Sequence, residues 1–182
     1  SGNRVYDNSV GILDGGNDKI TNNMVYDNTA TGILVRSSHT PSSGHGVYNN
    51  TIMQTTGTAI RVGDPDYRAD TTNVVIKSNI FDISGGYAIT MNSWGEQGFA
   101  SDYNLFHITG TGQLASWEGR SFATRTDWLY ELGFDANSLV GDPGLIDPDG
   151  ADNGRGYTTA PVGSSIILDD GLFQLRQAEF CA

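Results

Sequence analysis

Side chains suited to acid–base chemistry and to ligand binding gather in three segments of this chain, residues 37–45, 63–73 and 93–99. Together these segments contain His39, His45, Asp64, Asp66, Tyr67, Arg68, Asp70, Trp94 and Glu96. Imidazole and carboxyl groups are the usual general acids and bases of enzymes, and aromatic rings offer flat apolar faces to a ligand. The set admits three interpretations: proton abstraction by a lyase, hydrolysis by paired carboxyl groups, and binding without catalysis.

The two catalytic interpretations need different groups. A lyase that removes the proton alpha to a carboxylate requires a base and a cation that stabilises the developing enolate. Arg61 would be the cation, with His39 or His45 as the base. A glycoside hydrolase requires two carboxyl groups across the scissile bond, which the acids of adjacent loops, Asp64, Asp66, Asp70 and Glu96, would supply. The catalytic candidates are therefore Arg61, Asp64 and Glu96, against the alternative that the acids are solvated loop residues.

Binding without catalysis requires fewer groups in a fixed mutual geometry. Tyr67 and Trp94 would stack on sugar faces, while Arg61, Asn92 and Asp64 would hydrogen-bond hydroxyl groups. The substrate-binding set predicted from the sequence is Arg36, Tyr67, Thr90, Asn92 and Trp94.

A separate acidic segment suggests Ca²⁺ as a candidate cofactor. Asp147, Asp149 and Asp152 alternate with Gly and Asn in residues 147–154, as in the first half of a calcium loop, and are the candidate metal ligands. The EF-hand spacing and its closing Glu are not present in the sequence. An acidic turn without a metal is the alternative, because Asp-Gly and Asn-Gly also simply make turns.

A repeated pattern indicates the elements that would position these residues. Asn3-Arg4-Val5-Tyr6-Asp7-Asn8 recurs as Asn23-Met24-Val25-Tyr26-Asp27-Asn28, and weaker copies follow around residues 50–53, 78–82 and 103–106. The anchors of the copies are Val5, Val25, Ile52, Ile80 and Leu105, spaced 20, 27, 28 and 25 residues apart. A constant local pattern with variable spacing is typical of a solenoid whose loops carry insertions.

Each turn of the solenoid is expected to contain three short strands, whose side chains alternate between core and surface. The first strand holds Ile20, Val47, Val75 or Ala100, the second holds the anchors, and the third has a column of Ile12, Ile33, Ile60 and Ile89. The outward residues of the third strand are Leu34, Arg36, Arg61, Thr90 and Asn92. The turn between the first two strands is predicted at Asn22-Asn23, Asn49-Asn50 and Lys77-Ser78, where stacked asparagines have a structural role.

The later part of the chain adds a recognisable ending. It contains Ser101-Asp102-Tyr103-Asn104-Leu105-Phe106, then Trp117 and Trp128, then Gly133-Phe134-Asp135-Ala136-Asn137-Ser138, Gly141-Asp142-Pro143, and Tyr157 followed by residues 161–166. With the repeats, this order resembles the right-handed parallel β-helix repeat proteins related in fold to pectate lyases. The resemblance implies an all-β, right-handed parallel β-helix of four to five coils with a C-terminal capping segment that contains a short helix. It also implies that a groove forms along the third strand.

The boundaries follow from where the regular pattern stops, near Ile108. Residues 1–110 are expected to form the coils and residues 111–182 a capping segment of the same domain. Residues 123–132 are predicted to be helical, with Gly133 as the C-terminal stop and an apolar stripe around Trp128. Both Trp117 and Trp128 are interpreted as core residues that pack near the end of the solenoid.

Composition excludes several classes of function. The net charge is −11, with 21 acidic and 10 basic residues, which disfavours nucleic acid and also polyanionic glycans unless a cation mediates. The single cysteine, Cys181, cannot form an internal disulfide, and no apolar stretch is long enough to span a membrane. The first residues do not show a charged-then-apolar leader pattern, so any signal peptide is expected to lie outside this chain.

The sequence therefore predicts an extracytoplasmic polysaccharide-active or polysaccharide-binding module, extracellular or on the cell surface. If it is an enzyme, it is a polysaccharide lyase or a glycoside hydrolase; the alternative is a non-catalytic structural or adhesive solenoid. Because Asn3 aligns with Asn23, the chain is expected to start within a turn, as a fragment of a longer solenoid or with its open coil covered. End-to-end homo-oligomerisation through Val5, Tyr6, Ile12 and Leu13 is one expectation, and a truncated monomer is the other.

Overall fold

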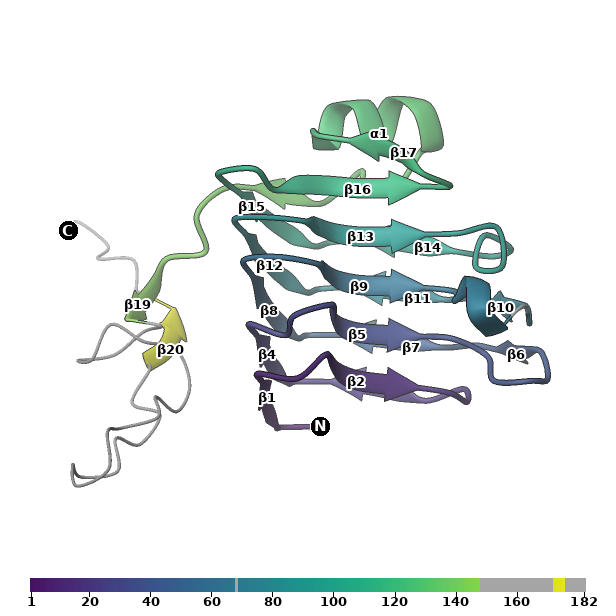
Figure 1. Cartoon of the computed structure of the whole chain (residues 1–182). Helices are drawn as coiled ribbons and strands as arrows, with labels where there is room; N and C mark the ends of the chain where they lie inside the picture. The colour runs from purple at the N-terminus through teal and green to yellow at the C-terminus, as the bar shows by residue number, and fades with distance from the viewer. Residues whose placement is uncertain (68, 148–171, 176–182) are drawn as a thin grey trace, which may run out of the picture. The chain divides into compact units, whose positions relative to one another are not determined.

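Successive turns of the chain stack into a right-handed parallel β-helix within residues 1–142 (Figure 1). This computed structural model describes residues 1–67, 69–147 and 172–175. Residues 143–182 form a second unit, in which β19 (Leu145–Asp147) pairs antiparallel with β20 (Leu172–Leu175). The predicted fold class is confirmed.

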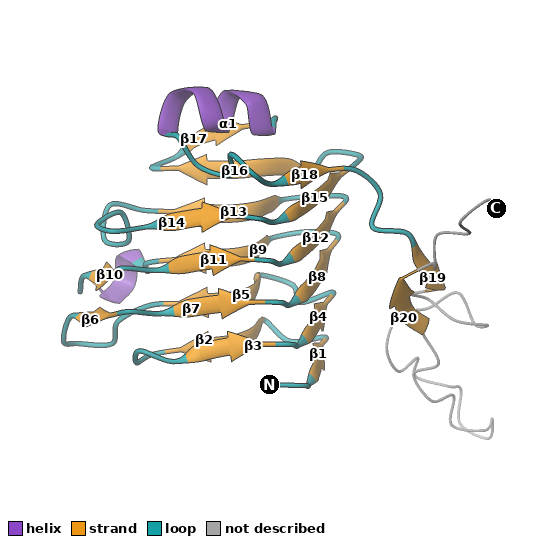
Figure 2. Cartoon of the chain, turned by 180° about the vertical axis from the view of Figure 1, so that it is seen from behind, coloured by secondary structure: helices purple, strands orange, loops and turns teal. Residues whose placement is uncertain are grey.

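Each complete coil contributes one strand to each of three sheets, named here in the order in which a coil such as β3–β4–β5 visits them (Figure 2). The first sheet consists of β3 (Lys19–Thr21), β7 (Gly46–Tyr48), β11 (Val75–Lys77) and β14 (Ala100–Asp102). The second sheet consists of β1 (Arg4–Tyr6), β4 (Met24–Tyr26), β8 (Thr51–Gln54), β12 (Ile80–Ile83), β15 (Leu105–Ile108) and β18 (Leu139–Val140). The third sheet consists of β2 (Val10–Asp14), β5 (Thr31–Val35), β9 (Thr58–Val62), β13 (Tyr87–Met91), β16 (Gln113–Trp117) and the antiparallel β17 (Arg120–Phe122).

The loops that leave the third sheet contain short elements of their own. β6 (Ser42–Ser43) and β10 (Thr71–Thr72) pair in parallel, and the 3-10 helix η1 (Pro65–Tyr67) lies in the loop between β9 and β10. Successive loops are therefore stacked on one another in the same way as the coils that support them.

The third sheet has the predicted register. Ile12 pairs with Ile33, Ile33 with Ile60, and Ile60 with Ile89. Of this column, Ile33, Ile60 and Ile89 are completely buried. The column continues to Ala115, so the stacking extends beyond the point at which the sequence pattern becomes irregular.

The second sheet corrects the predicted core. Val5, Val25 and Ile52 do stack on one another, but Ile52 pairs with Phe81 and not with Ile80. Phe81 and Phe106 are fully buried, and their rings stack at 5.0 Å between centroids. The prediction of Ile80 and Leu105 as inward residues was wrong by one position, because an aliphatic residue lies directly before each of these phenylalanines.

The first sheet shows the same offset of one residue. Val47 pairs with Ile76, which pairs with Ser101, so Ile76 and Ser101 occupy the positions predicted for Val75 and Ala100. Ile76 is fully buried, whereas Val75 is half-buried. A slip of one residue exchanges the two faces of a strand, so this small difference decides which side chains form the core.

An asparagine ladder joins the coils at the turn between the first and second sheets. Its rungs are Asn3, Asn23, Asn50, Asn79 and Asn104, and each side-chain oxygen after the first accepts the backbone N–H of the preceding rung at 2.9–3.1 Å. The residues before the last four rungs have left-handed backbone, with φ of 54–58°. The third turn is thus Ser78-Asn79 and not Lys77-Ser78, which accounts for the offset in the following strand.

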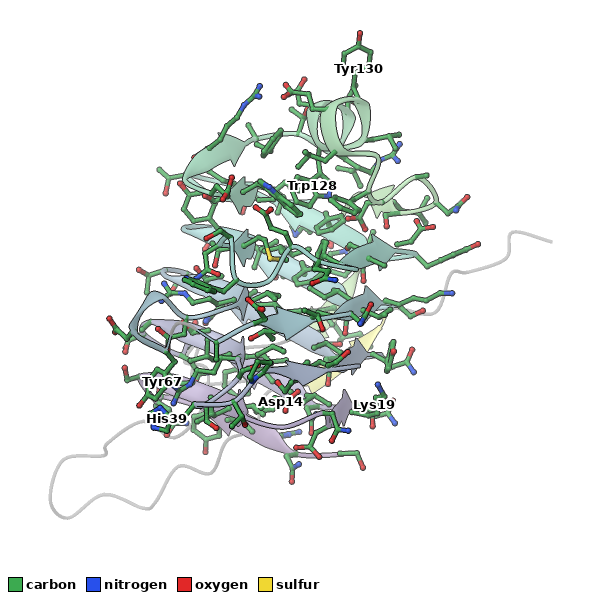
Figure 3. The ribbon with its side chains drawn as sticks, turned by 90° about the vertical axis from the view of Figure 1, so that its right-hand side faces the viewer. Asp14, Lys19, His39, Tyr67, Trp128 and Tyr130 are labelled. Carbon is green, nitrogen blue, oxygen red and sulfur yellow. The ribbon has the colours of Figure 1, made fainter. Side chains whose placement is uncertain are left out.

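A short helix and an aromatic cluster close the C-terminal end of the stack. Helix α1 (Arg125–Leu132) has Thr124 as its N-cap and ends at Gly133, whose φ of 80° is left-handed, as predicted. Trp128 is fully buried beneath the helix, as Figure 3 shows, and its indole N–H donates to Asp135 at 2.9 Å. The rings of Phe99, Trp117, Phe122 and Phe134 complete this cluster. The interpretation of both tryptophans as packing residues is consistent with these contacts.

Among the residues that the structure describes, no helix has the length and the apolarity that crossing a bilayer requires.

Candidate functional site

The polar candidates predicted from the sequence lie mainly on the loops between the third and first sheets and on the adjoining face of the third sheet. Figure 3 views the molecule from this loop side, where Tyr67 and His39 lie next to each other. Two distinct arrangements occur here, a groove on the third sheet and a cluster around Arg36.

The groove crosses β9 and β13 and has a volume of about 300 Å³. The residues that line it are Thr58, Arg61, Val62, Gly63, Tyr87, Thr90, Met91 and Asn92. Arg61 is exposed and pairs in register with Thr90, which confirms their predicted proximity on the third sheet. The hydroxyl oxygen of Thr90 is buried and has no hydrogen-bond partner among the described residues. The hydroxyl group can therefore accept a hydrogen bond from a bound molecule or donate one to it.

Gly63 keeps one end of the groove open. Its φ of +77° is left-handed, and a Cβ at this position would lie 2.0 Å from the Asn92 side-chain oxygen. That oxygen is held in place, because it accepts the backbone N–H of Trp94 at 3.1 Å. A side chain at position 63 would therefore collide with the Asn92 amide, and glycine leaves this space free.

The second arrangement, which we call the Arg36 cluster, consists of Arg36, His39, Asp64 and Tyr67. The Arg36 guanidinium carbon lies 3.3 Å from the centroid of the Tyr67 ring, and its Nε lies 3.7 Å from a carboxylate oxygen of Asp64. The rings of His39 and Tyr67 are 5.6 Å apart between centroids. Three predicted site residues, Arg36, Asp64 and Tyr67, are thus brought together, with Tyr67 stacked on a cation of its own chain.

Trp94 and Glu96 follow on the next loop. Trp94 is half-buried, and its carbonyl accepts the N–H of Thr71 at 2.7 Å. Burial raises the pKa of Glu96, and the neighbouring carboxyl group of Glu118 raises it further. Asp64 therefore contacts Arg36, whereas Glu96 lies beside Glu118, and these two carboxyl candidates belong to separate clusters.

His45 has a different environment from the one expected of a base beside Arg61. It is fully buried and hydrogen-bonds to Asp14 and Ser42, and none of these three residues lines the groove.

Sequence reasoning missed two residues that the structure brings to candidate sites. Tyr87 lines the groove, and its hydroxyl hydrogen-bonds to Ser121 at 2.9 Å. It directly precedes Ala88, the residue from which the third strand was counted. Asp14 is the partner of His45. The signal that could have identified it is an acid at the position where the following coils have Val35 and Val62.

The predicted calcium ligands belong to the acidic segment 147–154. Asp149, Asp152 and the side chain of Asp147 lie outside the described residues. Among the residues that are described, no group of three or more His, Cys, Asp or Glu side chains is placed to hold a metal ion.

Comparison of the chain with protein-family models, with curated proteins and with solved structures finds no match. What the chain shows on its own evidence is a parallel β-solenoid with a capped C-terminal end.

Proposed function

We propose that this protein binds a polysaccharide along the third sheet, with the groove across β9 and β13 as the central subsite. The observation that carries the proposal is the combination within one groove of an exposed guanidinium, an aromatic ring and an unpaired buried hydroxyl, from Arg61, Tyr87 and Thr90. Ligand sites typically combine an apolar lining with a few polar groups that fix orientation. A sugar ring offers the matching surfaces, since it has an apolar face and a rim of hydroxyl groups.

The shape of the solenoid supports a polymer as the ligand. Neighbouring strands of a sheet are about 4.8 Å apart, so equivalent positions recur at a fixed interval along the third sheet. Arg61, in the groove, and Leu34, two residues before Arg36, are register partners on adjacent strands. A chain that extends from the groove across this position would meet the Arg36 cluster, and across Asn92 it would meet Trp94.

Charge favours a neutral or weakly charged polysaccharide. The net charge of −11 disfavours polyanions at long range, and the single arginine in the groove does not offset it. With this ligand class we also propose an extracellular or cell-surface location and membership of the pectate-lyase-like superfamily. The support for that membership is the parallel three-sheet coil, the asparagine ladder and the long loops on one side.

Affinity electrophoresis or calorimetry with a panel of neutral and acidic soluble polysaccharides would test the proposal. Arg61→Ala and Tyr87→Ala should each weaken binding at least several-fold while the melting temperature changes little, because both side chains are at least partly exposed. Lys77→Ala removes the same charge from the first sheet and serves as the matched control. Equal binding by the two groove variants and the control would contradict the groove, and failure of the wild type to bind any glycan would favour the structural or adhesive alternative.

A further inference from the structure

Three side chains from two coils form a continuous hydrogen-bonded chain near the loop side. The Nδ1 atom of His45 lies 2.7 Å from a carboxylate oxygen of Asp14, and its Nε2 atom lies 2.8 Å from the Ser42 hydroxyl. Asp14 is 2% exposed and His45 is completely buried, while Ser42 is half-buried. A nucleophile within hydrogen-bond reach of a base, with the base oriented by a third group, is the arrangement of an acyl-transfer triad.

The buried position of Asp14 is energetically unfavourable for the fold. In the register of the third sheet, Asp14 pairs with Val35, and the column continues with Val62 and Met91. An acid thus occupies a position at which the next three coils have valine or methionine side chains. Burying a carboxylate is unfavourable unless it is paired and hydrogen-bonded. The pair with His45 and the N–H of Gly16 at 3.0 Å supply those bonds.

The roles of the two ring nitrogens follow from the Asp14 partner, because an ionised carboxylate can only accept a hydrogen bond. With its Nδ1–H donated to the Asp14 carboxylate, a neutral His45 presents the Nε2 lone pair to the Ser42 hydroxyl. Ser42 is held from its other side as well, because its oxygen lies 2.5 Å from the Ser37 oxygen and its N–H donates to the same atom at 2.9 Å. With the Ser42 proton directed at His45, the Ser37 hydroxyl is the donor between the two serines, and its single proton is shared with the Asp70 carbonyl oxygen at 2.6 Å.

We propose that Ser42 is a nucleophile, His45 its general base and Asp14 the residue that positions His45, in a site that hydrolyses small carboxylic esters. The inference does not depend on the polysaccharide groove. A small acyl group is the class that fits, because the immediate surroundings of the Ser42 oxygen are the side chains of Ser37 and His45 at contact distance.

The reaction balances without any further reactant than water. The Ser42 oxygen attacks the ester carbonyl carbon and forms a new C–O bond, while its proton passes to His45 Nε2. Collapse of the tetrahedral intermediate breaks the bond to the alkoxy group, which leaves as an alcohol with that proton. Water then attacks the acyl-enzyme, again with His45 as base, and releases the carboxylic acid and the Ser42 hydroxyl.

The strand that contains Ser42 supplies a donor for the developing negative charge. β6 bonds to β10 through the N–H groups of Ser42 and Gly44, which donate to Asp70 and Thr72. Successive N–H groups of a strand point to opposite edges, so the N–H of Ser43 faces away from β10. We assign this N–H, next to the nucleophile in the chain, to the oxyanion.

The test is covalent labelling of the full chain with diisopropyl fluorophosphate, together with hydrolysis of 4-nitrophenyl acetate. We expect one phosphoryl adduct, which peptide mass mapping assigns to Ser42, and ester hydrolysis that falls about 10³-fold or more in Ser42→Ala. Ser38→Ala, an exposed serine of the same loop, is the matched control and should keep both labelling and rate.

Asp14→Asn separates a positioning role from a purely structural one. If Asp14 holds the reactive tautomer of His45, this variant should lose most of the hydrolysis rate and change its pH profile, even at temperatures where circular dichroism shows it folded. A wild-type chain that acquires no adduct, or that hydrolyses the ester no faster than Ser42→Ala, would overturn the proposal. So would an adduct that maps to another residue.

Discussion

The asparagine ladder allows the sharpest prediction about stability. Asn79 is 1% exposed and takes part in five hydrogen bonds through its side chain. Its oxygen accepts the N–H and the side-chain amide of Asn50 at 3.0 and 3.1 Å. Its own amide donates to the carbonyls of Val47 and Lys77 and to the Asn104 oxygen at 2.9–3.2 Å. Asn79→Ala removes all five while leaving the backbone turn in place.

The cost follows from the groups left without partners. The variant orphans the buried N–H of Asn50 and weakens the bonding of the Val47 carbonyl and the Asn104 oxygen, and each buried group left unsatisfied costs about 1–3 kcal/mol. Allowing for partners that retain a second bond, we expect a loss of about 3–5 kcal/mol, a large share of the ~5–15 kcal/mol that stabilises a typical domain.

Urea denaturation followed by circular dichroism measures this loss directly. Asn3→Ala is the matched control, because Asn3 is the exposed end of the same ladder and its side-chain oxygen supports no further rung of those described. It should cost less than about 1 kcal/mol. Similar losses in the two variants would refute the reasoning that the ladder stabilises the solenoid through buried polar groups.

The core and the buried acid give the remaining predictions. Phe81→Ala should lower the free energy of unfolding by about 3–5 kcal/mol and Ile60→Ala by about 2–5 kcal/mol in the same assay. Ile80 is half-buried on the other side of its strand, so Ile80→Ala should cost less. Equal losses at Ile80 and Phe81 would contradict the register. Burial alone would raise the pKa of Asp14, but hydrogen bonds from His45 and Gly16 lower it overall. The stabilisation from this lowered pKa is therefore complete above the ordinary value of 3.8 and is lost as the pH falls through the lower folded value. Unfolding free energies should fall more steeply at acidic pH in the wild type than in Asp14→Asn, and parallel curves would show that Asp14 does not contribute in this way.

Residue types alone were enough to predict the fold and part of the candidate site. Isoleucines at equivalent positions of the third strand gave the correct column, and Arg61 and Thr90 were predicted as neighbours because strand alternation puts them on the same face. Tyr87 escaped notice because it precedes the point at which the alternating pattern becomes visible. Asp14 escaped because a single acid after a hydrophobic strand looks like an ordinary turn residue.

The sequence by itself determined the repeat. Apolar residues at a regular interval can bury their side chains only if the coils stack, and the same stacking lets the asparagines at the turns pair their amides. What the tertiary structure alone decided is the register within two of the sheets and the partners of the polar side chains. Ile80 and Phe81 are both apolar, so only the hydrogen-bonded alignment with Ile52 shows which one faces the core. Asp14 and His45 are 31 residues apart, and only the stacking of one coil and its loop on the next brings their side chains to 2.7 Å.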